Sequence, residues 1–437
     1  MSSPMSGPRA DRRCDVVVVG GGIVGCATAY YLARRGVRVI LLERGEVAGE
    51  QSGRNWGFVR QQGRDPVEVP LMVAANRTWR GLEQELDADI EWIQGGNLAL
   101  ASTPERLALF EGWLPTAREN GVDTRLVTPR EIQELLPGMV GAWVGGLYTP
   151  SDGHAEPAKA TQALGRAAVK LGVELHEGCA VEGIATEGGR IAEVRTELGV
   201  IRAGTVVCAA GAWSARLLRP VELRLPQRWV RATVARTTPA PPLTRAGVWG
   251  PAVSFRQRGD GTLNLAAAGA ADHDVTVDSL RHARLFWPNY WKNRKLFRFH
   301  VGRPLLRSLA GLLPGSAARR NPLTWDRGLG PVPNPAKVNR SLQELRRLYP
   351  ALGELQVTRS WAGYIDATPD AIPVIGEAGP SGLVVATGFT GHGFAMGPIV
   401  GRVVAELITD GKPSLDLRAF RFSRFAEGAV GKPRSVL

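Results

Sequence analysis

The chain of 437 residues contains no apolar run that approaches the ~20 residues needed for a membrane-spanning helix. Its opening, MSSPMSGPRADRRC, lacks the apolar stretch of a signal peptide, so we expect a disordered lead-in and a cytoplasmic location. The four cysteines have no metal-ligand spacing, so we expect buried, reduced thiols and no metal site. The chain also lacks a Ser-His-Asp or paired-carboxylate pattern, which disfavours the hydrolase chemistries that use them.

Hydrophobic residues make up 44% and charged residues 22% of the chain, which is ordinary for a globular protein with room for two domains. The net charge of +13 is not spread over the chain. Residues 281–347 contain fifteen Lys or Arg and two acidic residues, and the remainder carries equal numbers of both signs. The charge therefore belongs to one segment, and nucleic acid is an unlikely partner because no nucleic-acid-binding motif accompanies it.

The most informative stretch is residues 15–43, DVVVVGGGIVGCATAYYLARRGVRVILLE. Asp15–Val19 predicts a buried strand that a glycine turn ends, and Cys26–Arg35 predicts a helix. Val37–Leu42 predicts a second buried strand, with Glu43 at its carboxyl end. Strand, glycine turn, helix and strand in this order are typical of a dinucleotide-binding unit.

The glycines of the motif Gly20-x-Gly22-x-x-Gly25 have separate physical roles. Gly20 permits a tight turn, Gly22 lets backbone N–H groups approach a pyrophosphate, and Gly25 lets the helix pack close to the strand. The helix N-terminus adds free N–H donors and a partial positive charge. Glu43, eighteen residues after Gly25, is placed to accept hydrogen bonds from two ribose hydroxyls, which disfavours the 2′-phosphate of NADP.

The rest of the chain predicts a mixture of helices and strands. Helices are expected at Leu71–Leu86, 104–120, 129–135 (with Thr128 as N-cap and Glu131 at the third position), Pro157–Leu171, Asn339–Leu348 and about Gly397–Thr409. Strands are expected within Asp89–Ala101, at Val173–His176, Val181–Ala185, Ile191–Thr196, Gly199–Arg202, Thr205–Ala210, within 228–270, at Val357–Tyr364 and at Leu383–Thr387. The segment after Glu43 is expected to be a loop alongside a ligand.

Four motifs occur in a fixed order: VVVVGGGIVG with VILLE, CAAGAWS, WAGYIDATPDAIPVIG and GFTGHGFAMGPIVGRVVAELI. Together they resemble the D-amino-acid oxidase superfamily of flavoproteins, especially its glycine/sarcosine oxidase and L-amino-acid deaminase branches. The resemblance implies an α/β fold (α+β overall), with a Rossmann-type FAD-binding domain and an antiparallel-sheet substrate domain that carries a basic helical insertion. The expected boundaries are 1–90, 150–217 and 356–437 for the discontinuous FAD-binding domain, and 91–149 and 218–355 for the substrate domain, including a basic aromatic module at 278–338.

The resemblance implies a bound FAD, at which the first and the last of the four motifs meet in space. The residues expected at the cofactor are Gly20, Gly22, Ile23, Val24, Gly25, Glu43, Arg44, Gln51, Ser52, Arg54, Asn55, Trp56, Val181, Ala210, Gly211, Trp213, Gly363, Gly388, Thr390, Gly391, His392 and Gly393. Some relatives attach FAD to a cysteine near the C-terminal motifs. No cysteine follows Cys208 here, so we expect non-covalent FAD.

The residues of the last motif also favour a flavin site independently of the family resemblance. Gly388, Gly391 and Gly393 let the chain pass close to a flat ring. The helix expected from about Gly397 would point its positive end at the negative charge of a reduced flavin.

The segment EQSGRNWGFVRQQGRDP and the module resemble the L-amino-acid deaminase branch, in which the module helps to form the substrate pocket and touches the membrane surface. The module interleaves aromatic residues with Lys and Arg, as around Trp287 and Trp291. One interpretation of such a segment is that its aromatic side chains pack inward and its basic face is solvated. The others are that it binds an anionic membrane surface, a partner protein or acidic redox donor, or, least favoured, nucleic acid. Membrane anchoring is open, since the N-terminal spanning helix of anchored members is missing.

Amino-acid oxidation requires a group that receives the substrate carboxylate, which a guanidinium does best. Candidates are Arg60, Arg64, Arg303 and Arg359, with Gln61 or Gln62 adding a hydrogen bond, although an arginine of this kind is more often a surface charge. His392 is a candidate to polarise the flavin or orient substrate, or a structural histidine. Trp361 and Tyr364 are expected as pocket walls. Asp366 and Asp370 are expected as caps of turns, with catalysis as the minor alternative.

The leading hypothesis is FAD-dependent oxidation of the C–N bond of an amino acid, with a neutral or aromatic L-amino acid favoured as substrate. Oxygen or a quinone would accept the electrons. An oxidase of secondary amines of the sarcosine, glycine or opine type, or a tailoring enzyme for a specialised metabolite, is the alternative within the superfamily. A non-catalytic flavin-binding protein with a membrane- or nucleic-acid-binding module is the alternative of another class.

Overall fold

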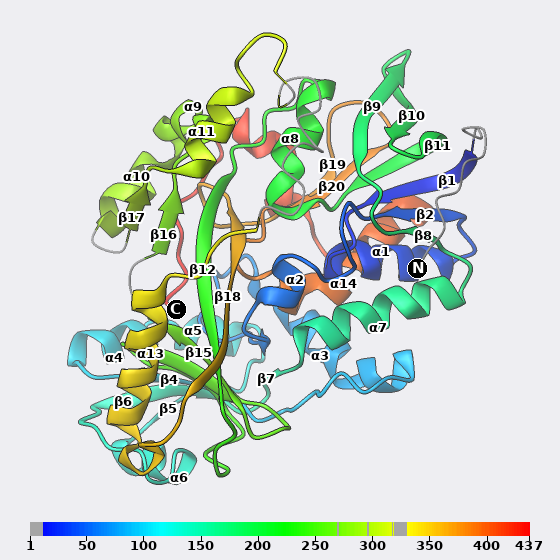
Figure 1. Cartoon of the computed structure of the whole chain (residues 1–437). Helices are drawn as coiled ribbons and strands as arrows, with labels where there is room; N and C mark the ends of the chain where they lie inside the picture. Colours follow the sequence, from blue (N-terminus) through cyan, green and yellow to red (C-terminus); the bar gives the residue numbers. More distant parts are fainter. Residues whose placement is uncertain (1–11, 269–270, 295–296, 317, 319–329) are drawn as a thin grey trace.

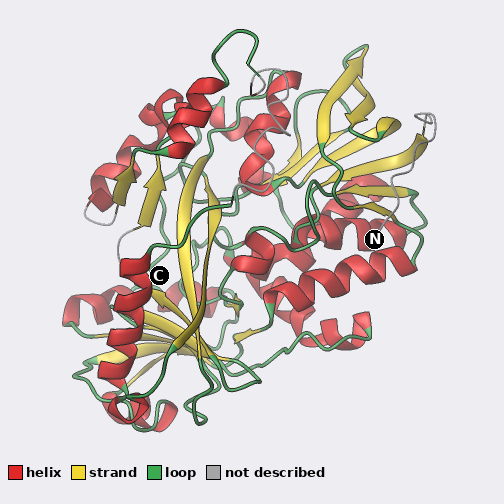
Figure 2. Ribbon diagram, viewed as in Figure 1, coloured by secondary structure: helices red, strands yellow, loops and turns green. Residues whose placement is uncertain are grey.

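A computed structural model describes residues 12–268, 271–294, 297–316, 318 and 330–437. Within these residues the chain forms two large sheets and one small one (Figures 1 and 2). Most of the predicted lead-in lies outside the described residues, but its last three residues already belong to the first strand. The prediction of a mixed α/β fold with two sheets is confirmed, and the domain boundaries remain a prediction.

The first sheet has the order β19-β20-β11-β1-β2-β8, with β10 and β9 attached to β11 as an antiparallel meander. Its described strands are β1 (Arg12–Val19), β2 (Val39–Leu42), β8 (Glu174–His176), β9 (Val181–Glu187), β10 (Arg190–Thr196), β11 (Gly199–Cys208), β19 (Val374–Glu377) and β20 (Leu383–Thr387). Strand β1 is parallel to both β2 and β11. Because both faces of a parallel sheet are covered, such a central strand reads as a continuous apolar run.

The two faces of β1 belong to different cores. Val16 and Val18 pack against helices α1 (Ile23–Ala33), α3 (Val69–Leu86), α7 (Pro157–Lys170) and α14 (Gly393–Asp410). Val17 and Val19 pack toward the β9–β10 meander and α8 (Ser214–Leu218). The Val-rich opening of the chain is thereby explained.

The second sheet has the order β17-β16-β12-β15-β14-β13-β4-β6-β5, with β18 paired to β12. Its described strands are β4 (Asn97–Ala101), β5 (Arg125–Val127), β6 (Gly145–Thr149), β12 (Arg228–Thr237), β13 (Gly247–Trp249), β14 (Val253–Gln257), β15 (Leu263–Ala267), β16 (Ala271–Asp274), β17 (Phe297–His300) and β18 (Val357–Ala367). Around it lie α4 (Pro104–Glu111), α5 (Leu114–Glu119), α6 (Pro129–Leu135) and α13 (Pro335–Leu348). The small sheet pairs β3 (Phe58–Val59) with β7 (Gly153–His154).

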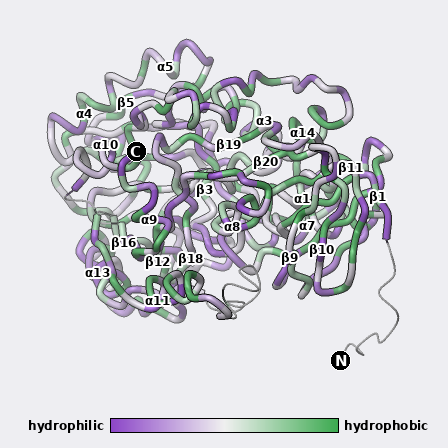
Figure 3. Tube along the Cα trace, turned by 90° about the horizontal axis from the view of Figure 1, so that it is seen from above, coloured by the Kyte–Doolittle hydropathy of each residue, from purple (hydrophilic) through white to green (hydrophobic). Residues whose placement is uncertain are grey.

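The basic module extends one end of the second sheet. Its described helices are α9 (Val277–Arg281), α10 (Ala283–Asn293) and α11 (Arg303–Ala310), and its strand β17 pairs with β16. Seen from above, α10, α13 and β16 lie at the side opposite to β1 and β11 (Figure 3). The long antiparallel pair β12–β18 lies between the module and the first sheet (Figure 1).

Several element boundaries differ from the prediction. The helix expected at 104–120 is two helices, because Pro115 lies in the first turn of α5 and favours a new start. The two strands expected within 199–210 are the single strand β11. The segment after Glu43, expected to be a loop, contains the short helix α2 (Gln51–Arg54) and β3, and α14 begins at Gly393, four residues before the expected start.

The remaining outcomes are simpler. The capping box of Thr128 and Glu131 is present at the start of α6. Within Asp89–Ala101 only Asn97–Ala101 forms a strand. All four cysteines are buried and free, as expected.

Candidate functional site

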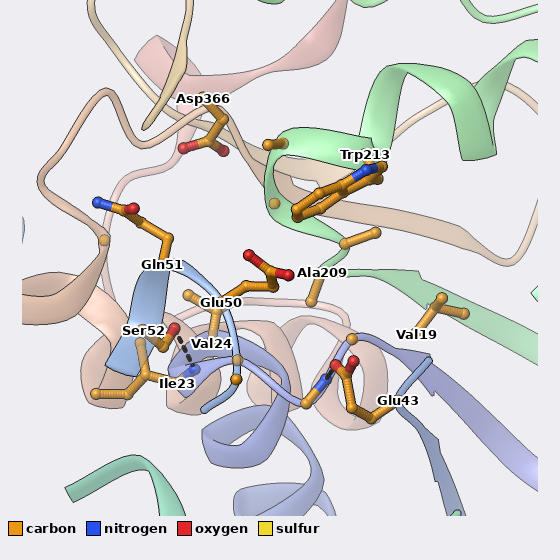
Figure 4. Close-up of a pocket in the computed structure, with 18 of the residues that line it drawn as sticks. Val19, Ile23, Val24, Glu43, Glu50, Gln51, Ser52, Ala209, Trp213 and Asp366 are labelled. Carbon is orange, nitrogen blue, oxygen red and sulfur yellow. Dashed lines mark hydrogen bonds between the residues drawn. The ribbon is translucent and has the colours of Figure 1, made fainter. Parts of the chain in front are cut away.

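The carboxyl ends of β1, β2 and β11 and the amino end of α1 border a cavity of about 1260 Å³ (Figure 4). The lining residues fall within 19–24, 42–55, 179–181, 209–217 and 364–394. Segments far apart in the sequence therefore meet at one site, where strand order places ligands in α/β sheets.

The glycine turn at the end of β1 leaves no room for side chains. Gly20 has a φ of +115°, and a Cβ there would lie 2.4 Å from the carbonyl oxygen of Ala209. A Cβ on Gly25 would lie 1.9 Å from the carbonyl oxygen of Gly20. The turn and the close approach of α1 both require glycine, as the motif predicts.

The N-terminus of α1 faces the cavity without a side-chain cap from its own N-cap residue, Gly22. The first helical N–H, that of Ile23, donates to Ser52 Oγ at 2.9 Å. Unpaired N–H groups of a first turn and the positive end of the helix together favour an anion such as a pyrophosphate.

Glu43 lies at the carboxyl end of β2 with both carboxylate oxygens engaged by backbone. Gly21 N–H donates to Oε2 and Gly45 N–H donates to Oε1, each at 2.7 Å. Burial raises the pKa of Glu43, and these two bonds oppose the shift. Since each carboxylate oxygen has a second lone pair, Glu43 can still accept hydrogen bonds from ribose hydroxyls.

The segment after Glu43 forms one wall of the cavity. The Arg44 guanidinium lies 3.7 Å from the centre of the Trp213 ring. Gln51 Oε1 and Trp213 Nε1 are buried polar atoms without a hydrogen-bond partner among the described residues. Unsatisfied buried polar groups at the wall of a large cavity fit a polar cofactor that would supply the partners, and the whole donor set fits FAD.

At its other end the cavity is bounded by Tyr364, Asp366 and the turn before α14. Asp366 is buried, and its Oδ2 accepts hydrogen bonds from Gly388 N–H at 2.7 Å and Thr387 Oγ1 at 3.2 Å. Burial raises its pKa to about 6. The N-terminus of α14, at Gly393, also faces this end and adds a second helix dipole.

The structure brings most of the expected cofactor residues to this one cavity. Those that line it are Gly20, Gly22, Ile23, Val24, Glu43, Arg44, Gln51, Ser52, Asn55, Val181, Ala210, Gly211, Trp213, Gly391 and Gly393. Those that do not line it are Gly25, Arg54, Trp56, Gly363, Gly388, Thr390 and His392. Of the expected catalytic residues, only Tyr364 lines it.

The residues outside the lining have packing contacts. Arg54 Nε donates to Gly49 O at 2.8 Å. The Trp56 ring lies 5.1 Å from the ring of Trp249. A Cβ on Gly363 would lie 2.2 Å from Gln51 Oε1. These residues support the cavity wall from behind.

His392 is absent from the lining, although its chain neighbours Gly391 and Gly393 belong to it. Its Nδ1 is 3.0 Å from Oε1 of Glu68, whose side chain is fully buried. Burial and the charge of Arg64 lower the pKa of His392, and Glu68 opposes them. Arg64 is also buried, its Nε donates to Arg60 O at 3.3 Å, and its Nη1 has no partner among the described residues.

The other catalytic candidates are dispersed. Gln62 is buried and donates to Asn97 O, Leu147 O and Thr149 Oγ1. Arg303 is exposed at the start of α11. Trp361 Nε1 donates to Arg54 O at 2.9 Å, which fixes the ring beside α2.

Sequence reasoning missed several lining residues. They include Val19, Gly21, Ala48, Gly49, Glu50, Ala209, Asp366, Phe389 and Phe394. Most are chain neighbours of residues that were predicted, so extending each motif by one position would have found them. Asp366 was expected chiefly as a turn cap, with a catalytic role as the minor alternative.

Within the described part of the chain, no three His, Cys, Asp or Glu side chains are grouped closely enough to hold a metal ion. No described helix combines the length and the apolar character that crossing a membrane requires.

Comparison with known proteins finds a match over residues 15–407 to the family model described as DAO, FAD dependent oxidoreductase. The chain is 28% identical to the mitochondrial sarcosine dehydrogenase of Mus musculus over 97% of its own length and 42% of that relative. The chain thus spans less than half the length of that protein.

Two solved structures are also similar. The L-amino acid deaminase from Proteus myxofaciens, in complex with anthranilate, has a TM-score of 0.89 and 29% identity over 97% of this chain and 96% of that one. The L-amino acid deaminase from Proteus vulgaris with its specific insertion sequence deleted has a TM-score of 0.77 and 25% identity, with 97% of each chain covered.

Proposed function

The chain belongs to the DAO family of FAD-dependent oxidoreductases, and from that premise we propose that it oxidises the C–N bond of an amino acid. The observation that carries the proposal is the single cavity that joins Glu43 at one end to Tyr364 and Asp366 at the other. A dinucleotide cofactor would occupy its length, and the second end would be left to the reacting ring and the substrate.

Bound FAD would take a hydride from the carbon that bears nitrogen, leaving an imine that hydrolyses to an oxo acid and ammonia. The chain's own residues bind and orient. The α1 N-terminus and Gly22 receive the pyrophosphate, and Glu43 receives the ribose. The α14 N-terminus would stabilise negative charge at the far end of the cavity.

We propose that Tyr364 and Trp361 wall the substrate side. The Tyr364 hydroxyl donates to Asp274 Oδ2 at 3.1 Å, which fixes its ring at the cavity. His392 and Arg64 would act through the turn before α14, because Glu68 links His392 to the segment that carries Arg64. The burial of Gln62 and the exposure of Arg303 favour neither as a direct contact.

A neutral or aromatic L-amino acid is the substrate class we favour, supported by the deaminase with a TM-score of 0.89. Secondary amines such as sarcosine are the second candidate, since sarcosine dehydrogenase is 28% identical to the chain. Anaerobic addition of separate pools of L-amino acids, D-amino acids and N-methyl amines tests both. Bleaching of flavin absorbance by the L-amino-acid pool alone is the expected result, and bleaching by N-methyl amines alone would replace the first candidate with the second.

We propose that FAD is bound non-covalently. Cys179 is the one cysteine in the lining of the cavity, and it lies near Glu43 at the dinucleotide end. Acid precipitation should therefore release all flavin into the supernatant, and yellow colour in the pellet would contradict this assignment.

We also propose that the module makes peripheral contact with a membrane. A quinone dissolved in that membrane would accept the electrons from the flavin, with oxygen as the alternative acceptor. On its described surface Trp287 is 56%, Trp291 57% and Val301 78% exposed. The lower TM-score of the deaminase that lacks its insertion supports a module of the same kind here. Sedimentation with anionic vesicles tests the contact.

A further inference from the structure

A second cavity, open to solvent, lies between helix α8 and the module helices α9 and α11. It neighbours the cofactor cavity: Ala212 lines both, and Trp229 Nε1 donates to Ala212 O at 2.6 Å. The Trp229 ring lies 4.8 Å from that of Tyr364, at the far end of the cofactor cavity. The two cavities therefore share a thin wall.

The second cavity is strongly basic. Among the described residues, four guanidinium groups and one carboxylate line it, and that carboxylate, Asp278, pairs with Arg219 and Arg281. Arg219 Nη2 donates to both oxygens of Asp278, at 2.9 and 3.1 Å, and Arg281 Nη1 donates to one at 3.0 Å. A single carboxylate cannot neutralise both, and Arg307 adds a further positive charge, so these three arginines and Asp278 among the described lining residues sum to +2.

Arg307 differs from Arg219 and Arg281 in its ion pairing. Among the described residues no carboxylate forms an ion pair with it, and it lines the cavity from α11. Its charge reaches Tyr364, whose pKa it acts to lower against the larger effect of burial. An anion bound at Arg307 would thus lie close to the substrate side of the cofactor cavity.

The lining is not purely polar. Val277 and Leu312 contribute aliphatic surface, and Trp229 contributes an aromatic face with the Arg216 guanidinium 4.9 Å from its centre. Guanidinium groups beside apolar walls suit a ligand with an anionic head and an apolar body.

We propose that this cavity binds the carboxylate of small organic acids with an apolar body and collects them beside the cofactor cavity. The collecting role rests on the proposed function, because an amino acid and the oxo acid formed from it both carry a carboxylate. A basic cavity raises the local concentration of such anions, an effect that salt weakens.

The test is arginine footprinting of the FAD-loaded protein with phenylglyoxal, read by peptide mass spectrometry, with and without benzoate. At a benzoate concentration about four times its dissociation constant, mass action predicts about fivefold slower modification of Arg307 and Arg281. Arg298, an exposed arginine of β17 outside this lining, is the matched internal control. Equal rates at Arg307 with and without benzoate would overturn the proposal, as would equal protection by inorganic phosphate, which lacks an apolar body.

Two variants of the lining, at Asp278 and at Arg307, should change the half-protecting benzoate concentration in opposite directions. Asp278→Asn releases Arg219 and Arg281 and should lower the half-protecting benzoate concentration about fivefold, a gain that misfolding cannot mimic. Arg307→Gln should raise that concentration at Arg281 about tenfold, and Arg298→Gln should leave it unchanged. Unchanged protection in both cavity variants would contradict the site.

The collecting role has its own readout. For whichever substrate bleaches the flavin, Arg307→Gln should raise KM with little change in kcat, because binding is weakened equally before and during the reaction. If no amine bleaches the flavin but benzoate still protects Arg307, the proposed function fails and the binding site stands. If amines bleach it and benzoate protects nothing, the function stands and this site fails.

Discussion

The two ends of the cofactor cavity are built in different ways. At the dinucleotide end, backbone groups of short contiguous motifs form the site: the turn at Gly20–Gly22, the start of α1, and Glu43 held by Gly21 and Gly45. At the other end, side chains from separate strands meet, as where Tyr364 of β18 contacts Asp274 of β16. A backbone site depends on local sequence, whereas a side-chain site depends on the packing of the whole second sheet.

The sharpest test of this contrast is a change in the glycine turn. Gly22→Val should abolish FAD binding, because even a Cβ at this position would lie 3.0 Å from Ser52 Oγ and the branched side chain would fill the pyrophosphate site. Flavin content per chain after reconstitution is the measurement. Gly81→Ala, in α3 with open space around it, is the control and should keep full FAD content. Normal flavin in Gly22→Val would remove the assignment of this end.

The far end should show its buried carboxyl in the pH dependence of stability. Asp366 has a pKa raised from 3.8 to about 6 in the folded chain, so the folded state holds a proton that the unfolded state has lost. The free energy of unfolding should therefore fall as pH rises through this window, by up to about 3 kcal/mol. Urea unfolding of flavin-free protein between pH 4 and 7 measures this, and Asp366→Asn should lack the fall. A parallel pH dependence in both proteins would show that Asp366 is ionised throughout.

A third test concerns the carboxylate at the dinucleotide end. Glu43→Ala removes the hydrogen bonds to Gly21 and Gly45 and the acceptor for the ribose, so FAD affinity should fall about 10- to 100-fold. Fluorescence titration of the flavin-free protein gives the dissociation constant. Glu43→Gln keeps the shape and should lose less. Equal affinities in the wild type and Glu43→Ala would mean that the ribose is bound elsewhere.

The smallest effect on the cofactor is expected from the module. Reversing the charges at Lys292, Arg294, Lys295 and Arg298 should leave FAD content unchanged, because none of the described residues of this segment lines the cofactor cavity. Sedimentation with anionic vesicles should weaken in the same variant, by about 1 kcal/mol per charge removed near the surface. Undiminished sedimentation would remove the membrane contact from the account.

The end of the cavity that backbone groups form was easier to predict from the sequence than the end that side chains form. The strand–turn–helix unit was predicted because glycine positions and apolar runs act locally, whereas the lining residues after Glu43 and around Val181 and Trp213 were expected from the family resemblance. His392 was expected either at the flavin or as a hydrogen-bonded structural histidine, and the sequence did not identify its partner, Glu68, a residue 324 positions earlier in the chain. Gln62 and Arg64 lie in the predicted segment, but burial by distant elements turns them inward. Contacts of this kind depend on tertiary packing, which periodicity does not encode.

The most direct test of the central claim is the visible spectrum of the purified protein after reconstitution with FAD, followed by anaerobic addition of pooled L-amino acids. The account predicts about one releasable FAD per chain and loss of the flavin absorbance on addition of the pool. A protein that stays colourless after reconstitution would contradict the assignment of the cavity to FAD.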